Sequence, residues 1–188
     1  DNEDIIQIFE TYKVERDIAE NIKRIKNGEK FNISNITAKI NNLETKELKL
    51  SDDQNNAIVE SFTNKINIVN GGPGVGKTKM LDILTKILEN EGLKIVLTAL
   101  TGRAAQKIYE STGLESKTIQ RTLEYKSSIN SFEKNEKNKL DADFVILDES
   151  SMVDMFLFLK LLKSIKTGTS FIIIGDVDQI PSISAGSV

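Results

Sequence analysis

The sequence contains neither cysteine nor histidine. Their absence excludes disulfides, Cys/His zinc sites, iron–sulfur clusters, a cysteine nucleophile and a Ser-His-Asp triad. Any chemistry must therefore use carboxylates, lysine, hydroxyls, backbone amides or a metal ion held by oxygen atoms. The lack of cysteine also suits a reducing compartment, so we expect a cytoplasmic location.

Long apolar runs are missing as well. The longest contain only a few residues, whereas a membrane helix needs about 20, and we expect no membrane partner. The first residues, Asp1 to Asp4, are acidic, unlike those of a signal peptide. The chain lacks an initiator methionine and stops at Ser187-Val188. We therefore expect it to be a fragment of a longer protein.

What the sequence does contain suits a soluble globular protein. Of its 188 residues, 28% are charged and 39% are hydrophobic, which is enough to build a buried core. The formal net charge is −3, so the chain has no overall basic character. A nucleic acid would have to be bound by a local groove rather than by the whole surface.

The first 49 residues have a helical pattern. Apolar residues recur three or four positions apart from Ile5 to Ile25, and Gly28 follows a basic last turn. A shorter helix is expected after Ser34, with Ile36, Ile40 and Leu43 on one side. We interpret residues 1–49 as a small helical linker segment that packs and connects.

From Leu50 the pattern changes to alternating strands and helices, which indicates a domain over residues 50–188. The expected strands are residues 66–69, 95–97, 144–147 and 171–174, and the expected helices are residues 52–62, 77–91, 102–110 and 155–165. The strands are continuous apolar runs, as in a parallel sheet buried on both faces. This predicts an α/β fold with helices on both faces of a parallel sheet. Residues 126–141 lack a period and are interpreted as a loop.

The segment from Gly71 to Thr78 matches G-x-x-x-x-G-K-[ST] between an expected strand and an expected helix. That context indicates the P-loop of an ATP-binding domain. Glycines let successive backbone N–H groups point at phosphate oxygens, and the helix N-terminus adds its positive dipole end. Lys77 would reach the β- and γ-phosphates. The expected ATP-binding residues are Gly72, Pro73, Gly74, Val75, Gly76, Lys77 and Thr78.

Two further segments can complete such a site. Asp148 and Glu149 follow an expected strand, at the sheet edge where ligands of parallel sheets bind. We expect the Thr78 hydroxyl and Asp148 to hold Mg²⁺ and Glu149 to act as general base toward the attacking water. Gln179 follows the next strand and can both donate and accept a hydrogen bond, so it is a candidate sensor of the γ-phosphate.

Four ordered segments resemble helicase motifs I, Ia, II and III of superfamily 1. They are residues 71–78, 100–105, 148–154 and 175–182. Their variants are most similar to the RecD-like branch, the family of the exodeoxyribonuclease V alpha subunit. Residues 50–54 resemble the Q motif that precedes the P-loop in such proteins. The resemblance covers residues 50–188, while residues 1–49 resemble the linker ahead of the motor only loosely.

This resemblance implies an ATP-dependent DNA helicase or translocase. Gln54 would hydrogen-bond the adenine base, and Thr101 and Arg103 would contact the backbone of single-stranded DNA. It also implies 5′-to-3′ movement, a role in DNA repair or recombination, a second RecA-like domain, and subunits of a nuclease complex as partners. The chain would be the first of two motor domains, truncated after motif III. We therefore expect it to bind ATP, to hydrolyse it very slowly and not to unwind DNA.

Other interpretations remain open at this point. The P-loop and the two carboxylates fit a nucleotide-dependent switch or assembly ATPase that never binds DNA. They also fit the motor of a conjugative relaxase-helicase, or a domain that keeps the fold without turnover. Thr101 could simply cap the helix that follows it, with Arg103 paired to a surface acid.

Overall fold

The computed structural model describes residues 9–45, 48–72, 74–176 and 178–179. Its centre is a sheet in the order β1-β7-β6-β2-β3, in which every pairing is parallel. The strands are β1 (Ile66–Asn70), β2 (Ile95–Ala99), β3 (Ser116–Thr118), β6 (Phe144–Asp148) and β7 (Ser170–Gly175). The predicted α/β fold with a parallel sheet is confirmed.

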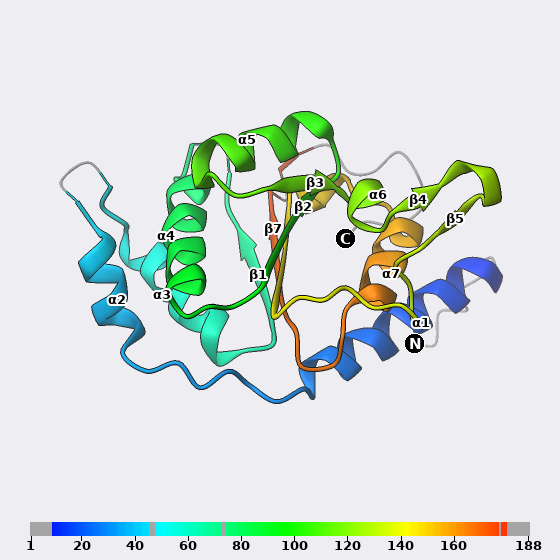
Figure 1. Cartoon of the computed structure of the whole chain (residues 1–188), viewed down its shortest axis with the longest axis horizontal. Helices are drawn as coiled ribbons and strands as arrows, with labels where there is room; N and C mark the ends of the chain where they lie inside the picture. The colour runs from blue at the N-terminus through cyan, green and yellow to red at the C-terminus, as the bar shows by residue number, and fades with distance from the viewer. Residues whose placement is uncertain (1–8, 46–47, 73, 177, 180–188) are drawn as a thin grey trace, which may run out of the picture.

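Helices cover both faces of this sheet (Figure 1). One face carries α2 (Ile36–Leu43), α3 (Asp52–Thr63) and α4 (Lys77–Asn90), and α5 (Gly102–Thr112) packs on α4, β2 and β3. The other face carries α1 (Phe9–Lys26) and α7 (Met155–Ser164). Each face has its own cluster of buried apolar side chains. The strands are apolar throughout because they are buried between these two clusters.

The first two helices each contribute to a different one of these clusters. Ile25 of α1 is fully buried on the α7 side, whereas Ile36 and Ile40 of α2 are buried on the α3–α4 side. Arg24 of α1 also contacts α7, because its guanidinium donates to the Leu162 carbonyl at 3.0 Å. The N-terminal segment therefore runs from one face of the sheet to the other and packs on both.

The segment that joins α1 to α2 passes close to the loop before β7. A Cβ atom on Gly28 would lie 2.5 Å from the backbone nitrogen of Gly168. Lys65 is only 2% exposed, donates to the Gly168 carbonyl and lies 3.9 Å from the centre of the Phe31 ring. Burial lowers the pKa of the Lys65 ammonium, which Asp143 partly offsets. This cluster ties the connecting segment to the edge of the sheet where β1 begins.

The structure differs from the sequence prediction between β3 and β6. The expected loop over residues 126–141 contains part of an antiparallel hairpin, β4 (Tyr125–Lys126) and β5 (Ser131–Phe132), joined by the 3₁₀ turn Ser127–Ile129. The rings of Tyr125 and Phe132 meet across it at 5.2 Å. Strand β3 and the one-turn helix α6 (Ile119–Thr122) were also not predicted. These elements are too short to show a hydrophobic period.

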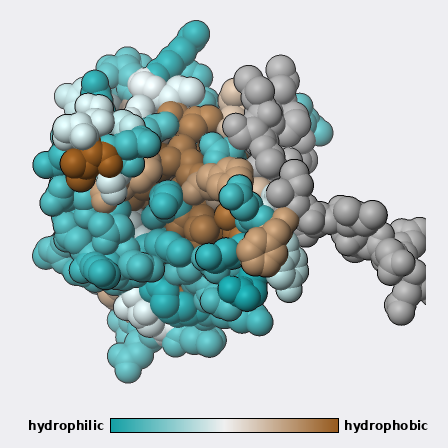
Figure 2. Space-filling model, turned by 90° about the vertical axis from the view of Figure 1, so that its right-hand side faces the viewer, coloured by the Kyte–Doolittle hydropathy of each residue, from teal (hydrophilic) through white to brown (hydrophobic). Residues whose placement is uncertain are grey.

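Figure 2 looks onto the side of the molecule that carries α1, α7 and the hairpin. Hydrophobic side chains gather near the centre of this view among hydrophilic ones. Elements on this side carry exposed apolar residues, namely Phe9, Ile129 and Phe156. Across the described ranges, no helix combines the length and apolar character needed to cross a membrane.

Candidate nucleotide-binding site

The P-loop connects β1 to α4 and has the backbone shape that its glycines permit. Gly74 and Gly76 have φ values of +78° and +83°, in the left-handed region that other residues rarely adopt. A Cβ atom on Gly76 would lie 2.4 Å from the side-chain nitrogen of Gln54. The loop is thus a backbone cradle at the N-terminus of a long helix, which fits a phosphate group. Pro73 lies outside the described residues.

Lys77, the first residue of α4, lies across the ends of two neighbouring strands. Its ammonium donates to the carbonyl of Gly71 and, at 3.3 Å, to the carbonyl of Gly175. The Gly71 amide donates to the same Gly175 carbonyl at 3.2 Å. The register of β1 with β7, which pairs Asn70 with Gly175, makes this possible. The lysine is therefore held at the carboxyl edge of the sheet.

Asp148 and Glu149 lie at the same edge of the sheet. Asp148 ends β6, which is the neighbour of β7. Burial raises the pKa of the Asp148 carboxyl, and the nearby negative charge of Glu149 raises it further. A hydrogen bond of 2.8 Å from the Glu149 backbone amide and the positive charges of Lys77 and Lys107 lower this pKa but do not cancel the rise. Glu149 itself has a φ of +52°, an uncommon value for a residue with a Cβ atom. The chain turns sharply here and leaves two carboxylates side by side.

The turn after Glu149 packs tightly on the end of β7. A Cβ atom on Gly175 would lie 2.6 Å from the Ser150 hydroxyl oxygen. The Ser151 hydroxyl donates to the side-chain oxygen of Gln179 at 3.5 Å, and the backbone N–H of Gln179 donates to the Asp176 carbonyl at 3.1 Å. Gln179 therefore lies beside the turn that carries the candidate base. The last residues of the fourth motif, 180–182, lie outside the described residues.

Gln54 has two partners in the structure. Its side-chain oxygen accepts from the Ser51 amide at 2.9 Å, which completes a capping box at the start of α3. Its side-chain nitrogen donates to the Val75 carbonyl in the P-loop at 2.6 Å. A pocket of about 370 Å³ lies here between α3, β1 and the P-loop, with Gln54 and Lys77 in its lining. The amide thus links α3 to the P-loop at the wall of this pocket.

Oxygen donors for a metal ion are present at the site. Thr78 is exposed in the first turn of α4, and Asp148 presents its carboxylate at the end of β6. Within the described part of the chain, no group of three or more acidic residues could form an all-protein metal site. Mg²⁺ is commonly bound by one or two protein ligands together with substrate phosphates and water. The Thr78 hydroxyl and the Asp148 carboxylate are therefore ligands of the type that Mg²⁺ takes from a protein when a nucleotide supplies the rest.

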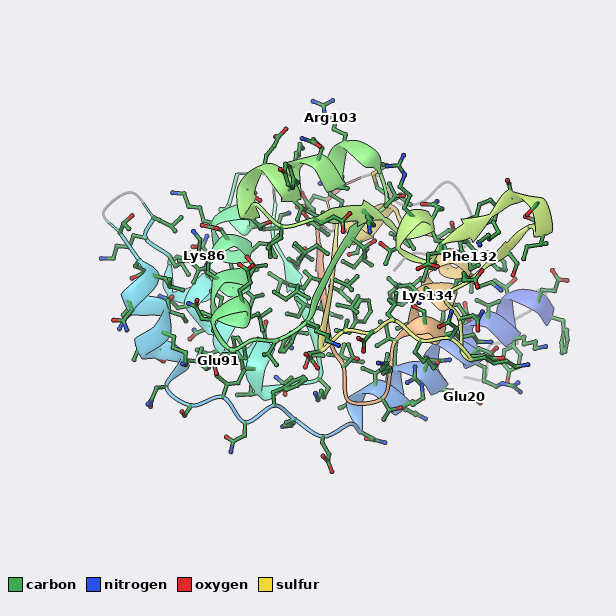
Figure 3. All side chains as sticks on the ribbon, in the orientation of Figure 1. Glu20, Lys86, Glu91, Arg103, Phe132 and Lys134 are labelled. Carbon is green, nitrogen blue, oxygen red and sulfur yellow. The ribbon has the colours of Figure 1, made fainter. Side chains whose placement is uncertain are left out.

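The expected DNA-side residues lie at the start of α5, which follows β2. The Thr101 hydroxyl accepts from the Ala104 amide at 3.2 Å and caps this helix. Arg103 is exposed and points away from the body of the molecule (Figure 3). Among the residues that the structure describes, no acidic side chain forms an ion pair with Arg103. Capping is thus an observed role of Thr101, and pairing of Arg103 to an acid is not observed.

One residue of the site was missed by sequence reasoning. The ammonium of Lys107 on α5 lies 3.8 Å from the Glu149 carboxylate. The two residues are far apart in the sequence, and Lys107 belongs to none of the recognised motifs. Its position one turn after Arg103 was the only available signal, and helical spacing does not reveal contacts with another strand.

Comparison with known proteins supports the sequence resemblance. Residues 54–185 match the model of a family described as an AAA domain, which is more than half of the chain. The chain belongs to this family. Over 137 residues it is 33% identical to the ATP-dependent RecD2 DNA helicase of Deinococcus radiodurans, covering 73% of this chain and 19% of that protein. Over 161 residues it is 29% identical to the RecBCD enzyme subunit RecD of Mycolicibacterium smegmatis, covering 73% of this chain and 29% of that protein.

The RecD-like resemblance is thereby confirmed, although the chain spans only 19% and 29% of the length of these two relatives. Among solved structures it is similar to the Pif1 helicase of Candida albicans, with a TM-score of 0.54 and 21% identity. That match covers 72% of this chain and 34% of the Pif1 chain. At this level of identity the likeness supports the fold alone. The roles of individual site residues stay predictions.

Proposed function

We propose that this chain is the first motor domain of an ATP-dependent helicase or translocase that acts on single-stranded DNA. The observation that carries the proposal is the arrangement of Lys77, Asp148 and Glu149 at one edge of the parallel sheet. Lys77 is tied to the ends of β1 and β7, and the two carboxylates lie at the end of the next strand of the sheet, β6. The arrangement places a phosphate-binding lysine, a metal ligand and a general base at the same edge of the sheet.

The residues would divide the work at ATP as follows. The P-loop amides and Lys77 bind the phosphates, and Gln54 at the pocket wall contacts the adenine base. Thr78 and Asp148 would hold Mg²⁺, which would neutralise charge on the phosphate oxygens. Glu149 accepts a proton from the attacking water. Gln179 responds to the γ-phosphate, and its contact with Ser151 passes that response to the turn after Glu149.

Single-stranded DNA would be bound at the start of α5. A motor that moves along any sequence must bind the phosphate backbone rather than the bases. Arg103 offers an exposed guanidinium for this purpose, and Thr101 holds the first turn of the helix that presents it. The family resemblance adds a 5′-to-3′ direction and a role in DNA repair or recombination.

Partners of the whole protein follow from the same resemblance. We propose a second RecA-like domain that completes the ATP site with arginine residues. In phosphoryl-transfer enzymes an arginine added in this way changes the rate by about 10³–10⁵. This chain alone should therefore bind ATP, hydrolyse it very slowly and fail to unwind a duplex. Subunits of a nuclease complex are proposed as further partners because relatives of the chain are named as subunits of the RecBCD enzyme.

Binding to DNA can be tested by fluorescence anisotropy of a labelled oligothymidylate. We expect the chain to bind it in a salt-dependent manner, and Arg103→Ala to weaken binding about threefold or more by removing a phosphate contact. Arg16→Ala is a matched control, because Arg16 is an exposed arginine on α1. Equal losses in the two variants, or no binding by the unaltered chain, would contradict the DNA-binding part of the proposal. Efficient duplex unwinding by this chain alone would contradict the need for a second domain.

A further inference from the structure

The candidate base has a cationic partner outside the P-loop. Lys107 lies 3.8 Å from the Glu149 carboxylate, and in the described part of the chain it is the cation that forms an ion pair with Glu149. The Lys107 side chain is 63% exposed, whereas that of Glu149 is 30% exposed. The pair therefore joins an accessible lysine to a partly buried carboxylate at the proposed reaction site.

The order of the strands shows on which side of Glu149 this lysine lies. The sheet runs β1-β7-β6-β2-β3. The P-loop follows β1, Glu149 follows β6, and the helix with Lys107 follows β2. Lys107 thus approaches Glu149 from the side opposite to the strand that carries the P-loop. An attraction toward Lys107 would therefore draw the carboxylate away from the strand that carries the P-loop.

The same helix carries the proposed DNA contact. Arg103 and Lys107 are four residues apart on α5, so their side chains lie on the same side of the helix. Both are exposed, and the guanidinium of Arg103 points outward at the surface (Figure 3). A phosphate of single-stranded DNA near Arg103 would also attract the ammonium of Lys107. Glu149 and a DNA phosphate would then compete for one cation.

We propose that Lys107 is a positioning residue that restrains Glu149, and that single-stranded DNA releases Glu149 by taking over Lys107. This rests on the proposed function, since it assigns a regulator to the same ATP site. No covalent bond forms or breaks in this exchange. The ion pair between Lys107 and Glu149 is replaced by one between Lys107 and a DNA phosphate. The ammonium remains charged throughout, while the carboxylate gains freedom to turn toward the attacking water.

The expected size of the effect follows from the exposure of the pair. An exposed ion pair shifts a conformational equilibrium by no more than about fivefold. A DNA phosphate can compete effectively with a partner held so weakly. The restraint should also weaken at high ionic strength, because salt screens exposed charges. The device is thus expected to tune the rate of hydrolysis modestly rather than to switch it on or off.

The test is single-turnover hydrolysis of labelled ATP with Mg²⁺ and an excess of the chain, with and without oligothymidylate. Lys107→Met removes the charge, and Lys107→Arg keeps it. Lys86→Met is the matched control, because Lys86 is a half-exposed helix lysine paired with Asp82 at 2.7 Å, away from the site (Figure 3). Lys77→Ala gives the background rate. A fluorescent ATP analogue measures nucleotide affinity in parallel.

We expect Lys107→Met to raise the rate without DNA about two- to fivefold and to lose most of the stimulation by DNA. Its affinity for the nucleotide analogue should stay within about twofold, since the lysine acts on the base and not on binding. Lys107→Arg and Lys86→Met should behave like the unaltered chain. A merely structural role would change the rate and the affinity together, whereas the proposed role changes the rate alone.

Three results would overturn the proposal. In the first, Lys107→Met hydrolyses ATP like the unaltered chain while both exceed Lys77→Ala, so that ATP hydrolysis stands and the restraint falls. In the second, Lys107→Met is slower than the unaltered chain, or Lys107→Arg matches Lys107→Met. In the third, the unaltered chain equals Lys77→Ala, and then the proposed hydrolysis fails together with its regulator.

Discussion

The ammonium of Lys77 donates to the carbonyl of Gly175, so the P-loop lysine is tied to the strand that leads to Gln179. The same carbonyl accepts the Gly71 amide, and the same glycine packs on the Ser150 hydroxyl. Gly175 therefore contacts both the phosphate-binding loop and the turn after the two carboxylates. The tight packing at this one residue fixes the relative positions of the two halves of the candidate site.

Gly175→Ala tests this packing directly. The added methyl group would lie 2.6 Å from the Ser150 oxygen, so the turn or the strand must shift. We expect a loss of about 1–3 kcal/mol in the free energy of unfolding, measured by denaturant titration, and weaker nucleotide binding. Adding Ser150→Ala removes the clashing oxygen and leaves the nearest Ser150 atom at 3.9 Å. The double variant should recover most of the loss, and equal stability of the single and double variants would contradict this account.

Gln54→Ala should loosen the P-loop. The variant loses the hydrogen bonds to the Ser51 amide and to the Val75 carbonyl, each with a net value of about 0.5–1.5 kcal/mol. We expect about tenfold weaker binding of ATP and a measurable loss for GTP as well, since the P-loop holds the phosphates of both. A larger loss for ATP would show the additional adenine contact that the family resemblance implies. Unchanged affinity for both nucleotides would contradict a role of Gln54 in holding the loop.

Asp148→Asn should stabilise the protein while impairing its site. Because burial raises the pKa of this carboxyl, the folded state binds the proton more tightly than the unfolded state does. Stability therefore falls as the pH rises through the interval between the unfolded and folded pKa values, and the penalty is fully present at pH 7. The neutral amide removes that penalty, so the melting temperature without nucleotide should rise. Binding of ATP that depends on Mg²⁺ should fall.

Asp141→Asn gives the opposite sign and serves as the control. Hydrogen bonds from Lys166 and Lys94, together with their charges, lower the pKa of the Asp141 carboxyl to about 2. Its contribution to stability is present above the unfolded pKa and is lost as the pH falls toward 2. At pH 7 this variant should melt slightly below the unaltered chain. A rise in melting temperature for Asp141→Asn, or a fall for Asp148→Asn, would contradict the assignment of the two environments.

Gly28→Ala tests whether the N-terminal segment is part of the fold. The new Cβ atom would lie 2.5 Å from the backbone nitrogen of Gly168. Relieving this clash requires a shift of the backbone, which costs more free energy than a side-chain rotation. We expect the free energy of unfolding to fall by about 1–3 kcal/mol. Gly102→Ala is a suitable control, since a Cβ atom there meets nothing within 4 Å. Equal stability of the two variants would show that the segment is only loosely attached.

Much of this structure follows from local patterns in the sequence. The four apolar strands and the P-loop were predictable because their signals are contiguous, and the Ser51 cap of α3 is visible as a residue type at a fixed spacing. Strands β3, β4 and β5 have only two or three residues and no apolar period. Buried Lys65 was not predictable, because lysine is rarely buried and its partners Gly168 and Phe31 lie far away in the sequence.

In the candidate site, too, local features were predictable from the sequence and contacts between distant segments were not. Its residue types and the strand ends that carry them were predictable, since parallel strands bring their carboxyl ends to one edge. The contacts between segments were not. The approach of Ser150 to Gly175, the contact of Lys107 with Glu149 and the bond from Gln54 to Val75 each join residues that no sequence spacing relates. These contacts decide how the residues act together.

The most direct test of the central claim is a titration of the chain with a fluorescent ATP analogue in the presence of Mg²⁺. Lys77→Ala removes the ammonium that contacts Gly71 and Gly175, and Lys86→Ala removes another lysine of the same helix. The account predicts saturable binding by the unaltered chain and by Lys86→Ala, with at least about a tenfold loss for Lys77→Ala. Binding that is equally strong in Lys77→Ala would contradict the proposal that this loop is the ATP site.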